Sequence, residues 1–298
     1  MKIDELLARM PRNQTRRSLL FVPGGRVDRI VKALESDADA VIIDLEDAVQ
    51  PSQKAAVRER LMEFLQTLDR SSVKKEIFVR INSIRSSNGM RDLLALVSVP
   101  LGGWDGVVLP KVQSGGEVEQ VEAILDESQC SASVGVLIET VEGLDRVNEI
   151  ASASDRVDFL MFGGADFASD LGVELARRPL EYARTRIVHS AARYGVASVE
   201  MPWIHLSDVS GYEDDVEYCF SLGFDSRAAI HPSQIEAIHK RLRPSDERVK
   251  SAMVIVEAYE KSGGGVCVVD GRLVERPLVL SAQRTLARAA ATAAKDGA

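Results

Sequence analysis

The sequence predicts an α/β protein whose main part is a (β/α)8 TIM barrel, followed by a C-terminal helix–hairpin–helix extension. Eight short, nearly continuous apolar runs recur along the chain, as expected of parallel strands that are buried on both faces. Amphipathic helical stretches separate these runs. Eight such alternations over about 240 residues indicate a closed barrel rather than an open sheet.

The elements of the barrel follow from this pattern in chain order. The apolar runs are Leu19–Val22, Ala40–Leu45, Ile77–Ile81, Val107–Leu109, Val134–Ile138, Val157–Phe162, Ala197–Met201 and Ala228–Ile230. The helical stretches include Val27–Leu34, Gln53–Leu68, Val118–Leu125, Leu180–Tyr194 and Ser233–Leu242. A further helix is expected over Val141–Ala153, with Leu144, Val147 and Ile150 on one side. The seventh run is the least regular, because Pro202 follows it directly.

The extension starts after Arg243. We expect a helix over Ser245–Ser262, then a hairpin whose strands are 266–269 and 272–275, because Asp-Gly between two apolar runs is a good two-residue turn. A last helix is expected over Leu278–Ala294. The predicted domains are therefore a barrel with a short N-terminal lead, residues 1–243, and an extension, residues 244–298. The extension is too small for a large core, so we expect it to pack on the barrel or on a neighbouring subunit.

Composition narrows the choice of partners and compartment. A net charge of −8 argues against a nucleic-acid or anionic membrane surface as partner. The cysteines Cys130, Cys219 and Cys267 form no CxxC pair, and with four scattered histidines they offer no zinc site. Residues 1–17 lack the apolar core of a secretory signal, and no run reaches the ~18 apolar residues of a membrane span. We expect a cytoplasmic protein with reduced thiols.

The barrel prediction places the functional residues at one end, because the chemistry of such barrels lies at the C-terminal ends of the strands. The residues that follow the runs are mostly charged or small: Pro23-Gly24-Gly25, Asp44, Glu46, Asp47, Arg80, Asn82, Pro110-Lys111, Glu139, Gly163-Gly164, Asp166, Glu200 and His231. A purely structural barrel has no reason to gather so many ionisable groups at this rim.

Two of these acids indicate a metal site. Glu139 and Asp166 end two neighbouring parallel strands, with no histidine or thiolate nearby in the sequence. Oxygen-only donors favour Mg²⁺, with Mn²⁺ as the alternative, over zinc or copper. Mg²⁺ leaves positions open for water and substrate, and the carboxylate and keto oxygen of a 2-keto acid fit them. The alternative is that both acids only cap the helices that follow.

The neighbouring charged residues suit an anionic substrate. Arg80 is expected to bind a substrate carboxylate or stabilise an enolate oxygen, or else to form a salt bridge with a strand-end acid. Asp44 and Glu46 share one side of an extended chain and are expected to bind metal-bound waters or orient Arg80 and Lys111. Lys111 is expected either to neutralise a ligand anion or to pair with one of these acids. For Asp47 we expect helix capping ahead of Pro51.

Two other features of the rim give weaker signals. His231 precedes a proline and is expected to be a structural hydrogen-bonding group. Gly24-Gly25, ahead of a helix, is a weak phosphate-binding signal.

Eight stretches together resemble a known family, the citrate lyase beta subunit and its stand-alone relatives, which include malyl-CoA and citramalyl-CoA lyases and belong with the hydroxy-keto-acid aldolases. The stretches are RRSLLFVPGG (16–25), AVIIDLEDAV (40–49), FVRIN (78–82), VVLPKV (107–112), LIETVEG (137–143), FGGADFASDLG (162–172), GFDSRAAIHPSQI (223–235) and VDGRLVERP (269–277). They cover nearly the whole chain in order, which makes the set specific although each stretch alone is modest.

The resemblance implies a Mg²⁺-dependent lyase that cleaves or forms a carbon–carbon bond in a 3-hydroxyacyl-CoA thioester, releasing acetyl-CoA or a related acyl-CoA and a 2-keto acid such as oxaloacetate. Glu139 and Asp166 would be the metal ligands, and Arg80 would bind the keto acid and polarise its carbonyl. Glu275 would reach a neighbouring subunit's site as acid/base, in a homotrimer or hexamer.

The sequence departs from the family pattern at three positions. Glu275 stands where relatives have aspartate, Glu200 where they often have aspartate, and Arg227 where lysine is usual. The metal and keto-acid half of the site is therefore intact, whereas the acid/base and thioester-facing half is altered. Two alternatives follow: a metal-dependent aldolase acting on free hydroxy-keto-acids, or a catalytically weakened subunit that only binds the keto acid.

Overall fold

The computed structural model describes residues 16–99 and 103–296. The stretch 1–17, expected to carry no secretory signal, therefore lies outside the described part except for its last two residues. The described chain forms two compact units, Arg16–Ile238 and the segment from His239 onward. No helix in these ranges combines the length and the apolar character that crossing a membrane requires.

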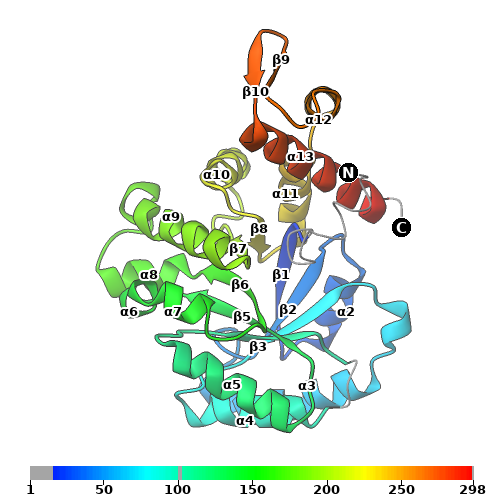
Figure 1. The fold of residues 1–298 in the computed structure, drawn as a ribbon. Coiled ribbons are helices and arrows are strands. Elements are labelled where there is room, and N and C mark those ends of the chain that lie inside the picture. The colour runs from blue at the N-terminus through cyan, green and yellow to red at the C-terminus, as the bar shows by residue number, and fades with distance from the viewer. Residues whose placement is uncertain (1–15, 100–102, 297–298) are drawn as a thin grey trace. The chain divides into compact units, whose positions relative to one another are not determined.

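The first unit is a closed barrel of eight parallel strands, with helices around it (Figure 1). The strands are β1 Ser18–Pro23, β2 Ala40–Asp44, β3 Glu76–Arg80, β4 Gly106–Leu109, β5 Ser133–Ile138, β6 Val157–Phe162, β7 Ala197–Glu200 and β8 Ser226–Ala229. The barrel closes because β1 pairs with β2 on one side and with β8 on the other. The fold class and all eight predicted strands are confirmed, with ends shifted by one or two residues.

The helices follow the strands in the expected alternation. They are α2 Val27–Glu35, α3 Lys54–Thr67, α4 Ser87–Val97, α5 Gly115–Glu127, α6 Val141–Asp145, α7 Val147–Ala151, α8 Gly164–Leu171, α9 Arg177–Tyr194, α10 Val209–Leu222 and α11 Ile235–Leu242. The last of them, α11, continues across the boundary between the two units. One prediction was wrong in detail: the single helix expected over Val141–Ala153 is two short helices, which meet at Arg146.

Apolar side chains fill the middle of the barrel. The rings of Phe78 and Phe159 meet edge to face, with centroids 5.4 Å apart. Gly135 makes room for this pair, since a Cβ there would lie 2.1 Å from the Phe159 ring. The Arg16 guanidinium lies over both rings and pairs with Asp158 at 2.7 Å. Because the interior is packed solid, the loops at the C-terminal ends of the strands are left to form the site.

The second unit consists of α12 Asp246–Lys261, the hairpin β9 Cys267–Val269 and β10 Arg272–Val274, and α13 Arg276–Asp296. Asp270 and Gly271 have φ values of 47° and 75°, as a two-residue hairpin turn with two positive φ angles requires. The two helices pack through Ala252, Ala282 and Leu286. The predicted helix–hairpin–helix order is confirmed.

Candidate active site

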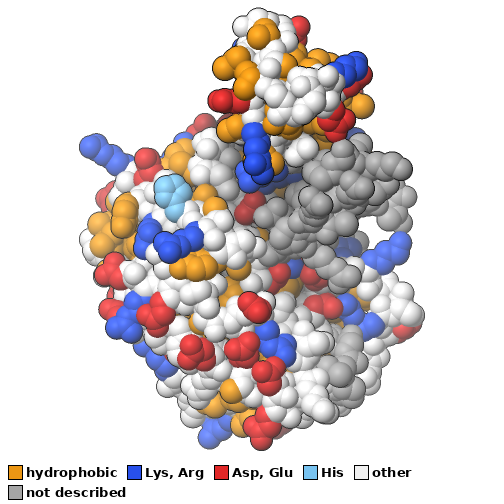
Figure 2. Space-filling model, in the orientation of Figure 1, with side chains coloured by type: hydrophobic (Ala, Val, Ile, Leu, Met, Phe, Trp, Pro, Cys, Tyr) orange, Lys and Arg blue, Asp and Glu red, His pale blue; other side chains and the backbone are white. Residues whose placement is uncertain are grey.

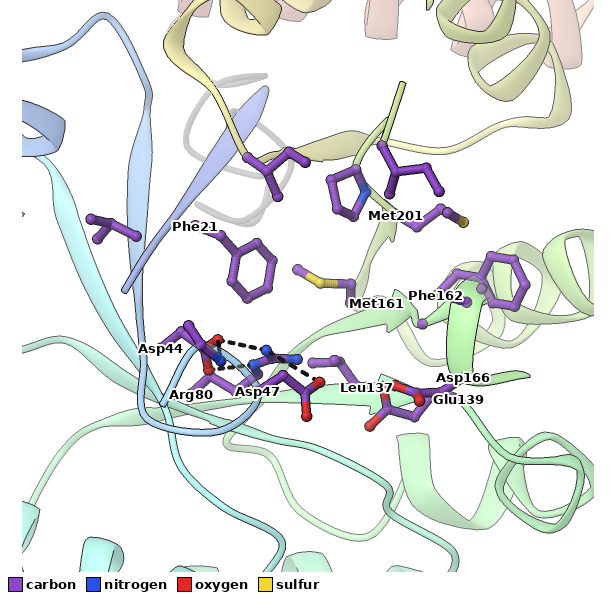
Figure 3. Close-up of a pocket in the computed structure, with 18 of the residues that line it drawn as sticks. Phe21, Asp44, Asp47, Arg80, Leu137, Glu139, Met161, Phe162, Asp166 and Met201 are labelled. Carbon is purple, nitrogen blue, oxygen red and sulfur yellow. Dashed lines mark hydrogen bonds and ion pairs between the residues drawn. The ribbon is translucent and has the colours of Figure 1, made fainter. Parts of the chain in front are cut away.

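A pocket of about 340 Å³ opens at the C-terminal ends of the barrel strands. Its charged lining includes Asp44 and Arg80, which end β2 and β3, Glu139, which follows β5, and Asp166, in the first turn of the helix after β6. Figure 3 shows these side chains along one side of the pocket. The rim predicted from the sequence is therefore a single site, and it lies entirely within the first unit.

Arg80 is the buried cation of this site. Its Nε and Nη2 donate to the two carboxylate oxygens of Asp44, at 2.8 and 2.7 Å. Its Nη1 lies 3.0 Å from Glu46 Oε2. Burial alone would lower the pKa of Arg80, but Asp44 and then Glu46 raise it above its ordinary value. Arg80 is therefore permanently charged, and the expected salt bridge to strand-end acids is present while the side chain still faces the pocket.

The carboxylate of Asp44 holds this arrangement to the backbone. Its two oxygens also accept hydrogen bonds from the main-chain N–H groups of Glu46, at 2.9 Å, and Ala48, at 3.1 Å. The loop after β2 is thereby folded around the same carboxylate that binds Arg80. Of the two roles expected for Asp44 and Glu46, binding metal-bound waters or orienting Arg80 and Lys111, these contacts fit the second.

Glu139 is the buried acid of the site, with only 1% of its surface exposed. Burial, and next the nearby Glu46, raise the pKa of Glu139 to about 8. Its Oε1 accepts a 2.6 Å hydrogen bond from the main-chain N–H of Lys111. A Cβ at Gly163 would lie 2.5 Å from its Oε2, so only a glycine there leaves that oxygen unobstructed. A buried carboxylate of this kind is best stabilised by a bound cation.

Asp166 lies in the first turn of α8, which begins just after β6. Its Oδ2 is 3.9 Å from Lys111 Nζ. Neither acid caps the helix that follows it: Thr140 caps α6, and the N-cap residue of α8 is Gly163, which has no side chain to cap it. The capping alternative is therefore wrong, and Glu139 and Asp166 both line the pocket, as Figure 3 shows.

Lys111 lies between the two groups of charges. Its Nζ donates to Glu46 Oε1 at 2.6 Å and lies 4.0 Å from Asp47 Oδ1. Its backbone has a φ of 55°, a left-handed conformation that costs a non-glycine residue roughly 1–2 kcal/mol. Such strain is concentrated at functional sites, where surrounding contacts maintain it.

The opposite side of the pocket is apolar. It is formed by Phe21, Met161 and Met201 (Figure 3), together with Pro202, Ile204 and Ile230. Sequence reasoning assigned Phe21 and Met161 to strands without orienting them. Side chains alternate along a strand, so only every second residue points inward. The sequence shows this alternation, but the register of the barrel is needed to tell which residues face the pocket.

A second pocket of about 450 Å³ adjoins the first at β1 and α2. Phe21 and Arg29 line both pockets, and Arg26, Lys32 and His231 line the second. Arg26 is bound to Asp28 at 2.8 Å. Arg29 and Lys32 form no ion pair with a carboxylate within residues 16–99 and 103–296. This pocket can therefore receive an anionic group.

Three other expectations from the sequence were wrong. Asp47 caps no helix: its Oδ2 lies 3.7 Å from Arg80 Nη2 and it lines the main pocket. Glu200 is not on the rim, because it is completely buried against Arg184 at 3.1 Å. Arg227 pairs with Asp215 at 2.6 Å and is equally buried. The departures at 200 and 227 therefore form buried ion pairs outside the pocket lining and do not alter the pocket itself.

The remaining sequence candidates fall outside the charged centre. His231 is a structural group, as expected, because its Nδ1 accepts from the Ser233 N–H at 3.2 Å. The N–H of Gly24 donates a hydrogen bond to the carbonyl oxygen of Asp44, at 2.8 Å. This N–H is therefore already bonded within the chain, which weakens the phosphate-binding signal of Gly24-Gly25. Glu275 is exposed and lies in the second unit between β10 and α13.

The structure defines a class of protein, a closed parallel (β/α)8 barrel in which two carboxylates and a buried arginine line one pocket at the C-terminal ends of the strands. The chain belongs to the HpcH/HpaI aldolase/citrate lyase family, whose sequence profile matches residues 17–232.

Curated relatives match over almost their full length. The chain is 32% identical over 291 residues to the citrate lyase subunit beta of Leuconostoc mesenteroides subsp. cremoris, covering 93% of this chain and 94% of that one. It is 31% identical over 293 residues to the L-malyl-CoA/beta-methylmalyl-CoA lyase of Cereibacter sphaeroides, covering 89% and 92%.

A solved structure is similar in both fold and sequence. The protein CitE from Mycobacterium tuberculosis, in complex with magnesium, acetoacetate and coenzyme A, superposes with a TM-score of 0.78 at 30% identity. The match covers 93% of this chain and 99% of CitE.

Proposed function

We propose that this chain is a Mg²⁺-dependent carbon–carbon lyase that cleaves a 3-hydroxyacyl-CoA thioester into an acyl-CoA and a 2-keto acid. The observation that carries the proposal is the meeting of Glu139, Asp166 and Arg80 in one pocket of a chain that belongs to this family. The candidate substrates are of the malyl-, citramalyl- or citryl-CoA type, because the relatives are named for citrate and malyl-CoA.

The donor set of the pocket fits Mg²⁺. Within the described residues, no group of three or more His, Cys, Asp or Glu side chains is placed to hold a metal ion. A cation held by Glu139 and Asp166 would therefore keep positions open for water and substrate, which is the usual state of Mg²⁺ in enzymes; Mn²⁺ has the same donor preference. Magnesium is present in the CitE complex. When bound, the ion would act as a Lewis acid towards the substrate oxygens.

The chain's own residues would hold the keto-acid part of the substrate from two sides. Arg80 presents a fixed guanidinium, already oriented by Asp44, and would stabilise the carbonyl oxygen of the keto acid. The first turn of α8 lines the same pocket and has no side-chain cap, so its N–H groups are suited to a carboxylate. Glu46 and Lys111 would keep Arg80 and the acids aligned.

In the bond-breaking step, the hydroxyl group of the substrate loses its proton and its C–O bond becomes the carbonyl of the keto acid. The adjacent carbon–carbon bond breaks, and its electron pair passes to the thioester as an enolate. A proton delivered to the enolate carbon completes the acyl-CoA. Arg80 would favour this step by stabilising negative charge at the substrate oxygen, and the apolar side of the pocket, including Met161 and Met201, would exclude water from the enolate.

The second pocket would accept the phosphate-bearing part of CoA. Arg29 is shared with the main pocket, and Lys32 lies one helical turn further along α2. A thioester in the main pocket therefore has a route for its anionic tail. This feature favours a CoA thioester over the alternative substrate, a free hydroxy-keto-acid, which has no use for it. The name of the matching family also includes aldolases, and the product assay below distinguishes the two substrates.

The acid/base group would come from another copy of the chain. We propose that residues 1–243 act as the catalytic domain and 244–298 as a lid over the site of a neighbouring subunit, in a homotrimer or hexamer, with Glu275 as acid/base. Val266, Val268 and Leu273 of the hairpin are 64%, 66% and 62% exposed in the single chain. Apolar side chains this exposed are typical of a surface that a partner covers.

We also propose that the protein acts in the cytoplasm and that its substrates are small molecules rather than nucleic acids. Lys, Arg, Asp and Glu side chains are mixed over the face shown in Figure 2, and this face has no continuous basic surface of the kind that binds nucleic acid. Cys130, Cys219 and Cys267 are all free thiols, which fits a reducing compartment.

A product assay tests the proposed function. Malyl-, citramalyl- and citryl-CoA, and free hydroxy-keto-acids as the comparison, would be incubated with the protein and Mg²⁺, and the acyl-CoA and keto acid quantified. We expect at least one thioester to yield both products in equal amounts, and none without metal. Cleavage of only the free acids would favour the aldolase. If keto acid binds with Mg²⁺ but no compound is cleaved, the chain is a binding subunit.

A further inference from the structure

Lys111 contacts both halves of the charged site. Its ammonium binds Glu46 at 2.6 Å, and Glu46 in turn lies 3.0 Å from Arg80. Its main-chain N–H binds Glu139 at 2.6 Å. One residue therefore links the arginine on one side of Figure 3 with the carboxylate pair on the other. The two contacts use different parts of Lys111, the side chain and the backbone.

The backbone contact depends on an unusual conformation. With a φ of 55°, Lys111 turns its N–H towards Glu139, while its carbonyl accepts a 3.0 Å hydrogen bond from Arg85 Nη2. The next residue, Val112, is held by close packing, because a Cβ at Gly143 would lie 2.4 Å from its carbonyl oxygen. The loop after β4 is thus fixed on both sides, in a conformation that glycine adopts without strain.

Lys111 has a backbone conformation that glycine would adopt without strain. The presence of a lysine there indicates that its side chain has a role in the site. The Lys111 side chain is one-third exposed, and its ammonium borders Glu46, Asp47 and Asp166. It therefore compensates acids around the proposed metal site while it fixes Glu46. Removing the ammonium would make the electrostatic potential of the site more negative, which favours a metal cation and disfavours an anionic substrate.

We propose that Lys111 is a positioning residue with two separable roles: its left-handed backbone orients Glu139 for the metal ion, and its ammonium orients Glu46, and through it Arg80, for the keto acid. The inference rests on the proposed function, because it takes Glu139 as a metal ligand and Arg80 as the keto-acid group. The metal half of the site then depends on the backbone of Lys111, and the keto-acid half depends on its ammonium.

Substitutions at one position separate the roles. Lys111→Met keeps a long side chain and the same backbone preference but has no ammonium. Lys111→Val also lacks the ammonium and, being β-branched, strongly disfavours a positive φ. Lys111→Arg restores the charge. Each full-length variant would be titrated with Mg²⁺ alone and with pyruvate in the presence of saturating Mg²⁺, by calorimetry, after its thermal unfolding has been recorded.

The two ligands are expected to respond in opposite ways. Lys111→Met should bind Mg²⁺ at least as tightly as wild type but bind pyruvate about tenfold more weakly, and Lys111→Arg should recover part of the pyruvate affinity. Lys111→Val should bind Mg²⁺ about tenfold more weakly than Lys111→Met, as is typical when a group that orients a metal ligand is disturbed. A residue that merely stabilises the fold would lower both affinities together.

A second variant tests the backbone role without touching Lys111. Gly143→Ala displaces the carbonyl of Val112 and is expected to weaken Mg²⁺ binding while the ammonium remains. The inference is overturned if Met and Val at 111 bind Mg²⁺ equally and Gly143→Ala binds it like wild type. It is equally overturned if Lys111→Met keeps wild-type pyruvate affinity. If wild type binds no Mg²⁺ or pyruvate at all, the proposed function itself fails, which is a distinct result.

Discussion

The guanidinium of Arg80 lies against the carboxylate of Asp44 with two hydrogen bonds of 2.8 and 2.7 Å. Both side chains are largely buried, and the carboxylate is held by the backbone of the following loop. This pair fixes the orientation of Arg80, a buried cation that lines the pocket.

Replacing Arg80 by Lys should impair turnover far more than metal binding. Lysine keeps the charge but cannot make the two parallel hydrogen bonds to Asp44. Losing one oriented donor to a developing oxyanion costs about 100-fold or more in kcat. Steady-state kinetics on the cleaved thioester, with Mg²⁺ titration alongside, checks this. A variant with normal kcat would remove Arg80 from the oxyanion role.

Replacing Asp44 by Asn should destabilise the protein, because the buried Arg80 would lose the carboxylate that accepts two of its hydrogen bonds and would keep only the ion pairs with Glu46 and Asp47. The expected loss is about 3 kcal/mol of unfolding free energy, measured by urea denaturation. Asp28→Asn is the matched control, since it breaks an exposed pair with Arg26 and should leave stability unchanged. Equal effects at both positions would contradict the importance assigned to burial.

Replacing Gly163 by Ala should weaken Mg²⁺ binding by about tenfold to 100-fold, the usual effect of disturbing a ligand's surroundings. The added methyl would meet Glu139 Oε2 at 2.5 Å. Gly116→Ala serves as the control, because the nearest atom to its Cβ would be 3.9 Å away. If the Gly163 variant binds Mg²⁺ normally, Oε2 of Glu139 is not a metal-facing oxygen.

The metal-free protein should lose stability as the pH rises. The pKa of Glu139 is raised by burial from 4.5 to about 8 in the folded chain, so between these values the folded state holds a proton that the unfolded state has released. Stability then falls with rising pH, by at most about 1.4 kcal/mol for each pH unit. Thermal melts of wild type and Glu139→Gln over this window, in chelator, measure the difference. Parallel curves would show that Glu139 does not titrate there.

Glu275 should act on the site of another copy. Glu275→Gln is expected to reduce kcat by about 100-fold, whereas Glu275→Asp should retain activity because it keeps the carboxylate. Mixed oligomers of Glu275→Gln and Glu139→Gln chains provide the sharper measurement, since some sites would then combine an intact Glu139 with an intact Glu275. Unchanged turnover in Glu275→Gln would exclude the acid/base role, and no recovery in the mixture would exclude sharing between subunits.

The barrel could be predicted from the sequence because parallel strands that are buried on both faces appear as continuous apolar runs. The polar residues at the C-terminal end of each run then mark the end of the barrel where the site lies. Glu139, Asp166 and Arg80 were located by this rule alone. The environment of these residues could not be predicted in the same way. Whether Asp47 caps a helix or faces Arg80 depends on the path of a loop, which tertiary contacts decide.

The positions of Glu200 and Arg227 show the same limit. Glu200 ends β7, whereas Arg227 lies near the start of β8. Both side chains form buried ion pairs, with Arg184 and Asp215 of the surrounding helices. The side on which a strand-end residue emerges is set by the register of the closed barrel, which a single sequence does not display. The left-handed backbone of Lys111 could not be predicted either, because lysine rarely adopts a positive φ.

The central claim is that Glu139 and Asp166 jointly hold one Mg²⁺ ion, and calorimetric titration of Mg²⁺ into the metal-free protein tests it most directly. Wild type should bind one ion per chain, and Glu139→Gln and Asp166→Asn should each abolish that binding while retaining the wild-type circular dichroism. Wild-type Mg²⁺ affinity in either folded variant would contradict the claim.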